Sequence, residues 1–176
     1  MKEICQDIKS HVADVLVEWE NLVREQPWFS LPADHRIDSL PDVIVGLVEA
    51  SLCNPRDEAA HRQKVEAAAE HGKHRCNQGI PEHMILTEYH LLRQAIWHYL
   101  LRRFGSSDQT VQAIMRIDTA ITLATNASMW GYHWQEIEAM GKWEEGMERI
   151  ISTSPFLRGN ALQDGSAPSG NSRDVT

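Results

Sequence analysis

Apolar residues recur at spacings of three and four along most of this 176-residue chain, and Pro or Gly residues interrupt the pattern at a few places. This spacing is that of one face of an α-helix. The strict alternation that indicates a β-strand is not sustained in any segment. The pattern therefore predicts an all-α protein, folded as a single helical domain of about five main helices.

Pro and Gly residues set the expected helix boundaries. Ser39 precedes Pro41 as a helix cap with proline in the first turn. Gly79 is placed to end a helix, and Pro81 to begin the next. The predicted helices span residues 2–26, 40–53, 55–78, 81–104 and 108–151, with an irregular connector before the second. We expect residues 1–154 to form the domain, and residues 155–176, rich in Gly, Ser, Asn and Pro, to be a disordered tail.

The last predicted helix is the longest, because its apolar pattern persists from Val111 to about Ile151. It carries two apolar stripes, and two apolar faces predict two partners: the rest of the domain and a second copy of the chain. We therefore expect a homodimer and a long C-terminal signalling helix. The expected dimer interface is formed by Ala127, Trp130, Trp134 and Ile137. A core helix of a monomer is the alternative.

Charge and cysteine content limit the class of protein. Asp and Glu (25) outnumber Lys and Arg (17), which disfavours nucleic acid as a partner. No apolar run approaches a membrane span and no signal peptide is found, so we expect a cytoplasmic protein without a membrane partner. Cys5, Cys53 and Cys76 are odd in number and far apart, which indicates neither a disulfide framework nor a zinc spacing, and favours a reducing compartment.

The most specific motif places Gly72, Arg75 and Gly79 before Glu88-Tyr89 and Leu92-Arg93. This arrangement resembles the RsbRD-type N-terminal domain of bacterial signalling proteins. The resemblance implies a helical sensor module that works with histidine kinase, cyclase, PAS or STAS outputs.

The same hairpin is similar to that of sensor globins, which place a haem-ligating His where this chain has Arg75. A guanidinium group stays protonated and cannot ligate iron. His74 is one residue away and faces another direction. The similarity implies a globin-like helical sensor without haem, and no cofactor is expected. A haem- or metal-binding gas sensor that uses another His is an alternative function.

His71 and Glu88 lie at equal distances from the turn at Gly79, so an antiparallel hairpin would bring them together. His is the side chain whose charge changes near neutral pH, and Arg binds anions bidentately. We expect a small-molecule ligand of unknown identity at His71, Arg75, Glu88, Tyr89, Arg93 and Trp97. A structural clasp at His71 and Glu88, and a packed Tyr-Arg-Trp ladder with cation–π support, are the alternatives.

Motifs for nucleophilic catalysis and for phosphate-binding glycine loops are absent, so we do not expect an enzyme. The nine His residues include no His-Glu-x-x-His pattern, and no metal site is expected. The sequence predicts a bacterial signal-sensing domain that dimerises and relays a signal through its last helix. The resemblance implies that the output is a domain or a partner protein of the kinase or STAS type. A ligand-free helical adaptor is the other alternative.

Overall fold

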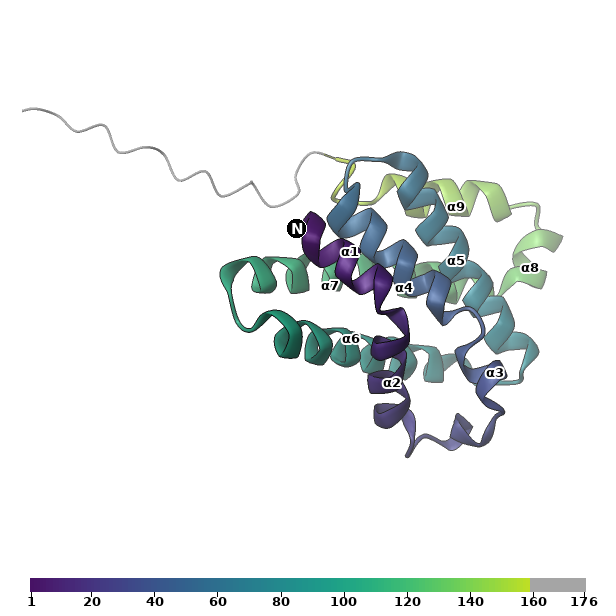
Figure 1. The fold of residues 1–176 in the computed structure, drawn as a ribbon. Coiled ribbons are helices and arrows are strands. Elements are labelled where there is room, and N and C mark those ends of the chain that lie inside the picture. Colours follow the sequence, from purple (N-terminus) through teal and green to yellow (C-terminus); the bar gives the residue numbers. More distant parts are fainter. Residues whose placement is uncertain (159–176) are drawn as a thin grey trace, which may run out of the picture.

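The computed structural model describes residues 1–158, which form helices with no strand among them (Figure 1). The α-helices are α1 Lys2–Ser10, α2 Val12–Val23, α3 Ala33–Ile37, α4 Leu40–Val48, α5 Glu58–Asn77, α6 Glu82–Phe104, α7 Asp108–Tyr132, α8 Trp134–Ala139 and α9 Trp143–Ser152. A 3-10 turn, η1 (Pro27–Ser30), and a π-helical turn, η2 (Glu49–Cys53), lie between them. The prediction of an all-α fold is confirmed.

The first predicted helix, residues 2–26, is in fact two helices. The chain turns at His11, whose φ of −127° and ψ of 31° lie outside the helical region. The Nδ1 atom of the His11 ring hydrogen-bonds the Asp7 carbonyl at 2.7 Å. The turn has a packing reason, since α1 lies on α4 and η2 whereas α2 lies along α6.

Helices α5 and α7 cross in close contact at the centre of the domain (Figure 1). A Cβ atom added at Gly72 would collide with the carbonyl oxygen of Ser128, and one added at Gly131 would collide with that of Ala69. The small residues of α7 therefore let another helix approach closely. That helix is α5 of the same chain.

The prediction of one continuous helix from Val111 to Ile151, and with it a long C-terminal signalling helix, is wrong. Helix α7 ends before His133, and α8 ends at Ala139, shortly before Gly141, whose φ of +64° is left-handed. The Gly141 N–H bonds the Glu138 carbonyl at 2.9 Å, and the Lys142 N–H bonds that of Ile137 at 3.1 Å. This is a glycine C-cap, which ends a helix rather than extending it.

Beyond this cap the chain folds back, and α9 packs on α5 and α7. Met147 and Ile151 are buried there. Phe156 is buried too and stacks on the His61 ring, with centroids 5.8 Å apart. Residues 155–158, which the sequence assigned to the tail, thus pack on the domain, while the rest of the expected tail, 159–176, lies outside the described residues. Within residues 1–158, no helix has the length and apolar character needed to cross a membrane.

Candidate functional site

The predicted contact between His71 of α5 and Glu88 of α6 is confirmed. The hairpin turns at Gly79, which has a φ of +70°, and the Ile80 N–H bonds the Arg75 carbonyl at 3.0 Å. Across this turn His71 Nε2 lies 3.0 Å from Glu88 Oε2, and both side chains are buried. The equal spacing from the turn was therefore a sound guide to an antiparallel contact.

Arg75 is the centre of the cluster, and its side chain is fully buried. Its Nε donates to Glu88 Oε2 at 2.9 Å, and its Nη2 donates to Glu88 Oε1 at 2.7 Å. This is the bidentate geometry that a planar guanidinium makes with a carboxylate. Arg75 therefore binds the carboxylate of its own chain, in the way that the sequence proposed for an external anion.

The other edge of the Arg75 guanidinium holds the connector that precedes α4. Nη1 donates to the His35 carbonyl at 3.1 Å and lies 3.2 Å from Asp38 Oδ2, while Nη2 donates to the Arg36 carbonyl at 2.6 Å. Ser39 Oγ lies 2.9 Å from His71 Nδ1 and donates to Asp38. The buried cluster thus joins the connector to the α5–α6 hairpin.

The charges of this cluster stabilise one another. Burial alone would raise the pKa of Glu88, but His71 and the Arg75 guanidinium outweigh it and hold that pKa at about 2. The pKa of Asp38 is lowered as well, because Arg75 and the Ser39 bonds outweigh burial. The pKa of Arg75 is raised, since its bonds to Glu88 and Asp38 outweigh burial. These three groups are charged in the folded protein at neutral pH.

Tyr89 extends the cluster toward α7. Its hydroxyl lies 2.7 Å from Ser128 Oγ, which donates to the Ala68 carbonyl at 2.5 Å. The Tyr89 ring meets the His71 ring edge-on, with centroids 5.7 Å apart. Burial raises the pKa of Tyr89, so its hydroxyl keeps its proton. Tyr89 therefore links three helices through groups that already have partners.

Arg93 and Trp97 lie apart from the cluster. Arg93 forms an ion pair with Asp118 of α7. Trp97 is half-buried, and its indole nitrogen has no hydrogen-bond partner among residues 1–158. No cation–π contact between the two is recorded within residues 1–158. Of the six predicted ligand residues, the structure brings together His71, Arg75, Glu88 and Tyr89 (the ionic cluster, together with Asp38).

A surface hollow of about 250 Å³ lies beside the ionic cluster. It is lined by Asp34, His35, Asp38, His74, Asn77 and Gln78. Asp38 belongs to both the hollow and the cluster. His74, the residue next to Arg75, is held between Glu70 at 3.2 Å and Asp38 at 3.4 Å. Sequence reasoning missed Asp38 because it lies in the connector, where no helical spacing indicates a direction.

The residues present do not fit a haem group. The position of the iron ligand is filled by Arg75, whose nitrogens are engaged by Glu88, Asp38 and backbone carbonyls. His71 has a hydrogen-bond partner on each ring nitrogen. The ring nitrogens of His74 face carboxylates, with Nε2 3.2 Å from Glu70 and Nδ1 3.4 Å from Asp38, although Nδ1 makes no hydrogen bond within residues 1–158. A haem ligand needs a free ring nitrogen. The nearby His residues are therefore committed to the protein's own carboxylates and hydroxyls.

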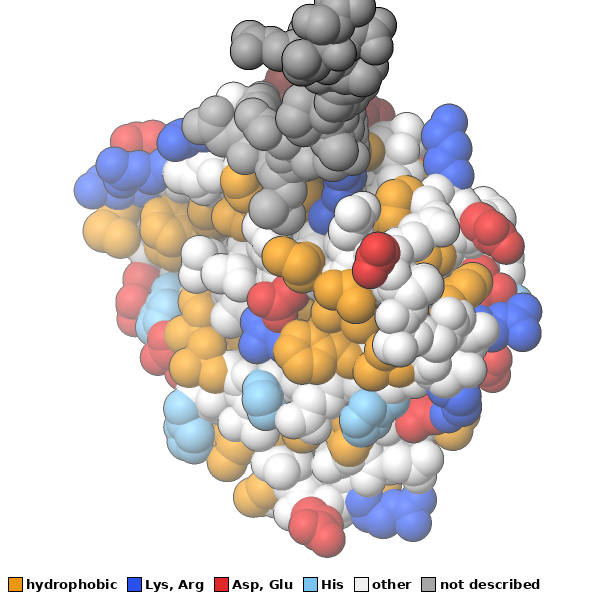
Figure 2. All heavy atoms as spheres, turned by 90° about the vertical axis from the view of Figure 1, so that its left-hand side faces the viewer, with side chains coloured by type: hydrophobic (Ala, Val, Ile, Leu, Met, Phe, Trp, Pro, Cys, Tyr) orange, Lys and Arg blue, Asp and Glu red, His pale blue; other side chains and the backbone are white. Residues whose placement is uncertain are grey.

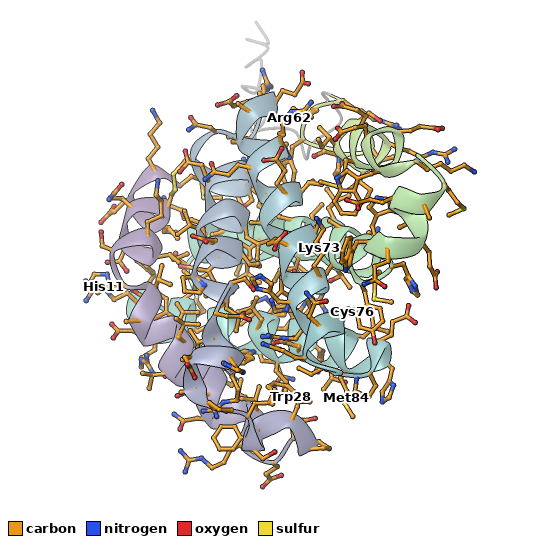
Figure 3. All side chains as sticks on the ribbon, turned by 90° about the vertical axis from the view of Figure 1, so that its right-hand side faces the viewer. His11, Trp28, Arg62, Lys73, Cys76 and Met84 are labelled. Carbon is orange, nitrogen blue, oxygen red and sulfur yellow. A yellow bond between two sulfur atoms is a disulfide. The ribbon has the colours of Figure 1, made fainter. Side chains whose placement is uncertain are left out.

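The four predicted interface residues lie near the fold-back. Ala127 and Ile137 are buried within the chain, at 0% and 5% exposure. Gly146 of α9 sits against the Trp130 ring. Lys73 of α5 points toward the α8–α9 segment (Figure 3). Its Nζ lies 4.3 Å from the centre of the Trp143 ring and 5.7 Å from that of Trp134.

A second buried basic cluster, which the sequence did not reveal, lies at the other end of α5. Lys64 is 1% exposed and has no carboxylate within ion-pair distance in the described chain. Its Nζ lies 3.3 Å from His61 Nδ1, which also lies 3.2 Å from Ser154 Oγ, while His61 Nε2 lies 3.0 Å from the Pro55 carbonyl. Burial lowers the pKa of Lys64 to about 8.

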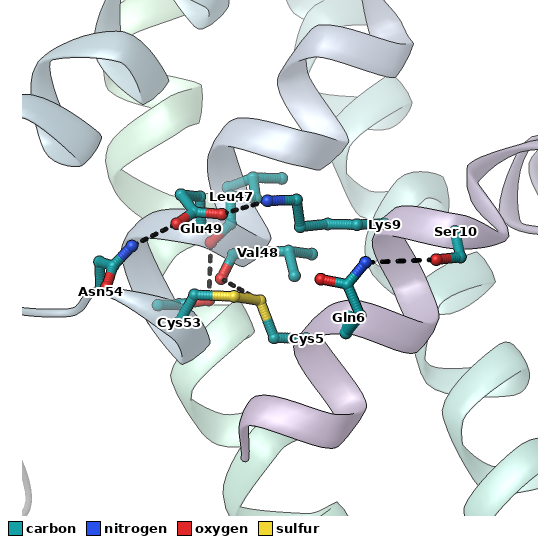
Figure 4. Close-up of a disulfide and its surroundings, with 10 residues drawn as sticks. Cys5, Gln6, Lys9, Ser10, Leu47, Val48, Glu49, Cys53 and Asn54 are labelled. Carbon is teal, nitrogen blue, oxygen red and sulfur yellow. Dashed lines mark hydrogen bonds and ion pairs between the residues drawn. A yellow bond between two sulfur atoms is a disulfide. The ribbon is translucent and has the colours of Figure 1, made fainter.

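The expectation of no disulfide is wrong. Cys5 of α1 and Cys53 of η2 are bonded to each other, with their Cα atoms 5.9 Å apart (Figure 4). Their sequence separation of 48 gave no sign of the pairing, because the packing of α1 across η2 brings them together. Cys76 is free and half-buried on α5.

One comparison with known proteins places the chain in a family. The family model for the RsbT co-antagonist protein rsbRD N-terminal domain matches residues 12–145, which include the whole ionic cluster. Neither the curated proteins nor the solved structures contain a match to this chain. Because the match covers more than half of the sequence and confirms the resemblance of the hairpin motif, the chain belongs to the family of RsbT co-antagonist protein rsbRD N-terminal domains.

Proposed function

We propose that this chain is a bacterial signal-sensing domain in which a signal changes how residues 27–39, the connector, dock on Arg75. The family is one of signalling regulators rather than catalysts, which supports the proposal. The observation that carries it is the position of Arg75, which binds the connector through backbone carbonyls and Asp38, and binds α6 through Glu88. A buried set of charged bonds is lost as a group, which gives the docking two distinct states.

The signal enters at the hollow beside Asp38. A ligand that offers hydrogen-bond donors or positive charge to the Asp38 carboxylate competes with Arg75 for it. When Asp38 moves toward the ligand, Arg75 loses its ion pair with Asp38 and holds the connector less firmly. In this proposal His71, Arg75, Glu88 and Tyr89 couple the ligand to the helices, rather than touching it, while Arg93 and Trp97 have no part.

The output is a contact with a signalling protein in the cytoplasm. The family description names co-antagonists of RsbT, which favours a protein partner of the kinase or STAS type. Because α9 folds back on the domain, the contact surface lies on the body of the domain rather than on a projecting helix. Residues 32–35 of the connector are exposed next to the hollow, and they are the segment that a change of docking would alter first.

Pairing of two copies is part of the proposal, through a different surface from the one expected. Leu101 at the end of α6 and Val111 at the start of α7 are each more than two fifths exposed, and so is Met115 one turn on. They lie about the same α6–α7 turn, and hydrophobic side chains gather on this side of the molecule (Figure 2).

Met115→Asp should convert a dimer to a monomer in light scattering, whereas Val17→Asp, at an exposed apolar residue of α2, should not. A monomeric parent protein would remove pairing from the proposal.

A thermal-shift screen of metabolites tests the sensor function. A ligand of the hollow at about one hundred times its dissociation constant stabilises the folded state by about 2.7 kcal/mol. It should raise the melting temperature of the parent protein but not that of Asp38→Asn. Asp34→Asn, on the rim of the same hollow, serves as the matched control and should keep most of the response.

Two results would count against the sensor. A ligand that stabilises Asp38→Asn as strongly as the parent binds elsewhere and does not act through Asp38. If no metabolite raises the melting temperature while a partner protein still binds, the chain is a helical adaptor without a ligand.

A further inference from the structure

Three potential metal donors meet where α1 crosses η2. One donor atom from each of Cys5, Glu49 and Cys53 lies within 4.8 Å of the others. Figure 4 shows the two sulfur atoms joined and the Glu49 carboxylate beside them. Cys5 is fully buried, while Cys53 is half-buried.

The backbone explains how these donors come together. The chain at Glu49–Cys53 is a π-helical turn, closed by the Asn54 N–H on the Glu49 carbonyl at 2.9 Å. Such widened turns are rare and are often found at functional sites. On the other side, buried Ile4 and Ile8 fix α1 on the core and direct Cys5 toward this turn. The site is thus assembled from two rigid elements.

Glu49 is already oriented by two neighbours. Lys9 Nζ donates to its Oε2 at 2.6 Å, and Asn54 Nδ2 donates to its Oε1. Carboxylates that bind metals are characteristically held by such hydrogen bonds from outside the ligand set. The charges also balance, because two thiolates and a carboxylate carry three negative charges, and a divalent cation with the Lys9 ammonium supplies three positive ones.

We propose that, in the reduced protein, Cys5, Glu49 and Cys53 bind a thiophilic divalent cation of the Zn²⁺ class. Thiolate sulfur selects such ions, and Zn²⁺ accepts a carboxylate oxygen with them. Three protein ligands leave a fourth position for water. The site does not depend on the proposed sensor function, and it pins α1, which precedes the family-matched residues 12–145, to the domain.

The disulfide and the metal exclude each other at this site. Reduction by an external thiol or phosphine breaks the S–S bond, and each sulfur gains one electron and one proton while the reductant is oxidised. Metal binding then releases the two thiol protons to solvent and forms two sulfur–metal bonds. A surface hollow of about 280 Å³ has Lys9 and Glu49 in its lining, so the carboxylate side of the site opens to solvent.

Titration with Co²⁺ tests the proposal, because thiolate–cobalt bonds absorb in the near ultraviolet. The phosphine-reduced protein should bind one Co²⁺ per chain with this absorption, and Zn²⁺ should displace it. The oxidised protein should show none until it is reduced. Cys53→Ser should lose at least half of the absorption, and Cys76→Ser, which removes the free cysteine, should leave it unchanged.

Glu49→Gln keeps both sulfurs and the disulfide, so its folding is not in question in the oxidised form. Its affinity for Co²⁺ should fall at least about tenfold. Absence of thiolate–cobalt absorption in the folded, reduced parent would overturn the proposal. So would its loss in Cys76→Ser, or an unchanged affinity in Glu49→Gln. Circular dichroism on each reduced protein establishes that the fold is present.

Discussion

Helix α5 buries one arginine and one lysine, and within residues 1–158 only the arginine is paired with carboxylates. Arg75, near its C-terminal end, is paired with Glu88 and Asp38. Lys64, three turns earlier, has only His61 and no carboxylate within ion-pair distance in residues 1–158. The pKa of Glu88 falls to about 2, whereas that of Lys64 falls to about 8. A buried charge thus stabilises this fold where its partner is buried with it, and destabilises it where no partner is present.

The largest expected effect comes from breaking the ion pair between Glu88 and Arg75. Glu88→Gln leaves the buried Arg75 guanidinium without its main counter-charge, and such a loss costs about 3–5 kcal/mol of unfolding free energy. Urea denaturation at neutral pH measures it. Glu82→Gln on the same helix removes a partly exposed carboxylate that pairs with His133, and it should cost no more than about 1 kcal/mol. Equal losses in the two variants would show that the ionic cluster does not hold the fold.

Acid should reduce the contribution of Glu88 to the free energy of unfolding over a defined pH range. The pKa of Glu88 is about 2 in the folded protein and 4.5 ordinarily, so its contribution is present above the ordinary value and is lost as pH falls through about 2. This amounts to about 3 kcal/mol. Urea midpoints recorded across the acid range should decline accordingly. The decline should be clearly shallower in Glu88→Gln, and a parallel decline would assign the acid effect to other carboxyl groups.

For Lys64, which has no carboxylate partner in residues 1–158, we expect substitution to change stability in the opposite direction. Lys64→Met removes a buried ammonium, and we expect the variant to be more stable than the parent at pH 7 by about 1–3 kcal/mol. Because the folded pKa of Lys64 lies below its ordinary 10.5, the parent gains stability as pH rises from about 8 to that value. The difference between the two proteins should therefore shrink in alkaline solution.

Denaturation of Lys64→Met at neutral and alkaline pH provides this measurement, and Lys2→Met, at an exposed residue, is the control. If Lys64→Met were less stable than the parent at every pH, the contact with His61 would fully offset the cost of burying the Lys64 ammonium.

The smallest effect is expected for a pair that is not buried. Arg62 and Glu148 approach to 2.6 Å between α5 and α9, but Arg62 is partly exposed and Glu148 is exposed. Exposed pairs contribute little because water screens them. Glu148→Gln should leave the urea midpoint unchanged within error. A measurable loss would mean that pairing stabilises this fold wherever it occurs, and the contrast between Arg75 and Lys64 would lose its explanation.

The sequence predicted those features that follow from regular spacing within a hairpin. His71 and Glu88 are equidistant from Gly79, and this arithmetic is enough once the helices are antiparallel. It could not reveal Asp38, because the connector follows no repeat. Nor could it separate Lys64 from an exposed lysine, since α5 is polar on average and its buried side includes Lys64, His61, His71 and Arg75.

The error over the last helix has a specific cause. Gly141 fits the helical spacing of Trp134 and Ile137, so the spacing alone predicts a continuous helix through it. Its left-handed φ shows that it ends one instead. The available signal was a glycine that precedes Lys142 and a new helix with acidic residues in its first turn. The disulfide left no comparable signal, because Cys5 and Cys53 meet only through tertiary packing.

The glycines at the helix contacts differ in whether a second mutation could repair damage to them. An alanine at Gly146 would meet the Trp130 ring, an obstacle that a smaller residue at 130 would remove. At Gly72 and Gly131 the obstacle is a main-chain carbonyl oxygen, of Ser128 and Ala69 respectively. No amino-acid replacement trims a carbonyl, so a suppressor search should recover compensating changes for Gly146→Ala at position 130 and none at the facing residues for the other two.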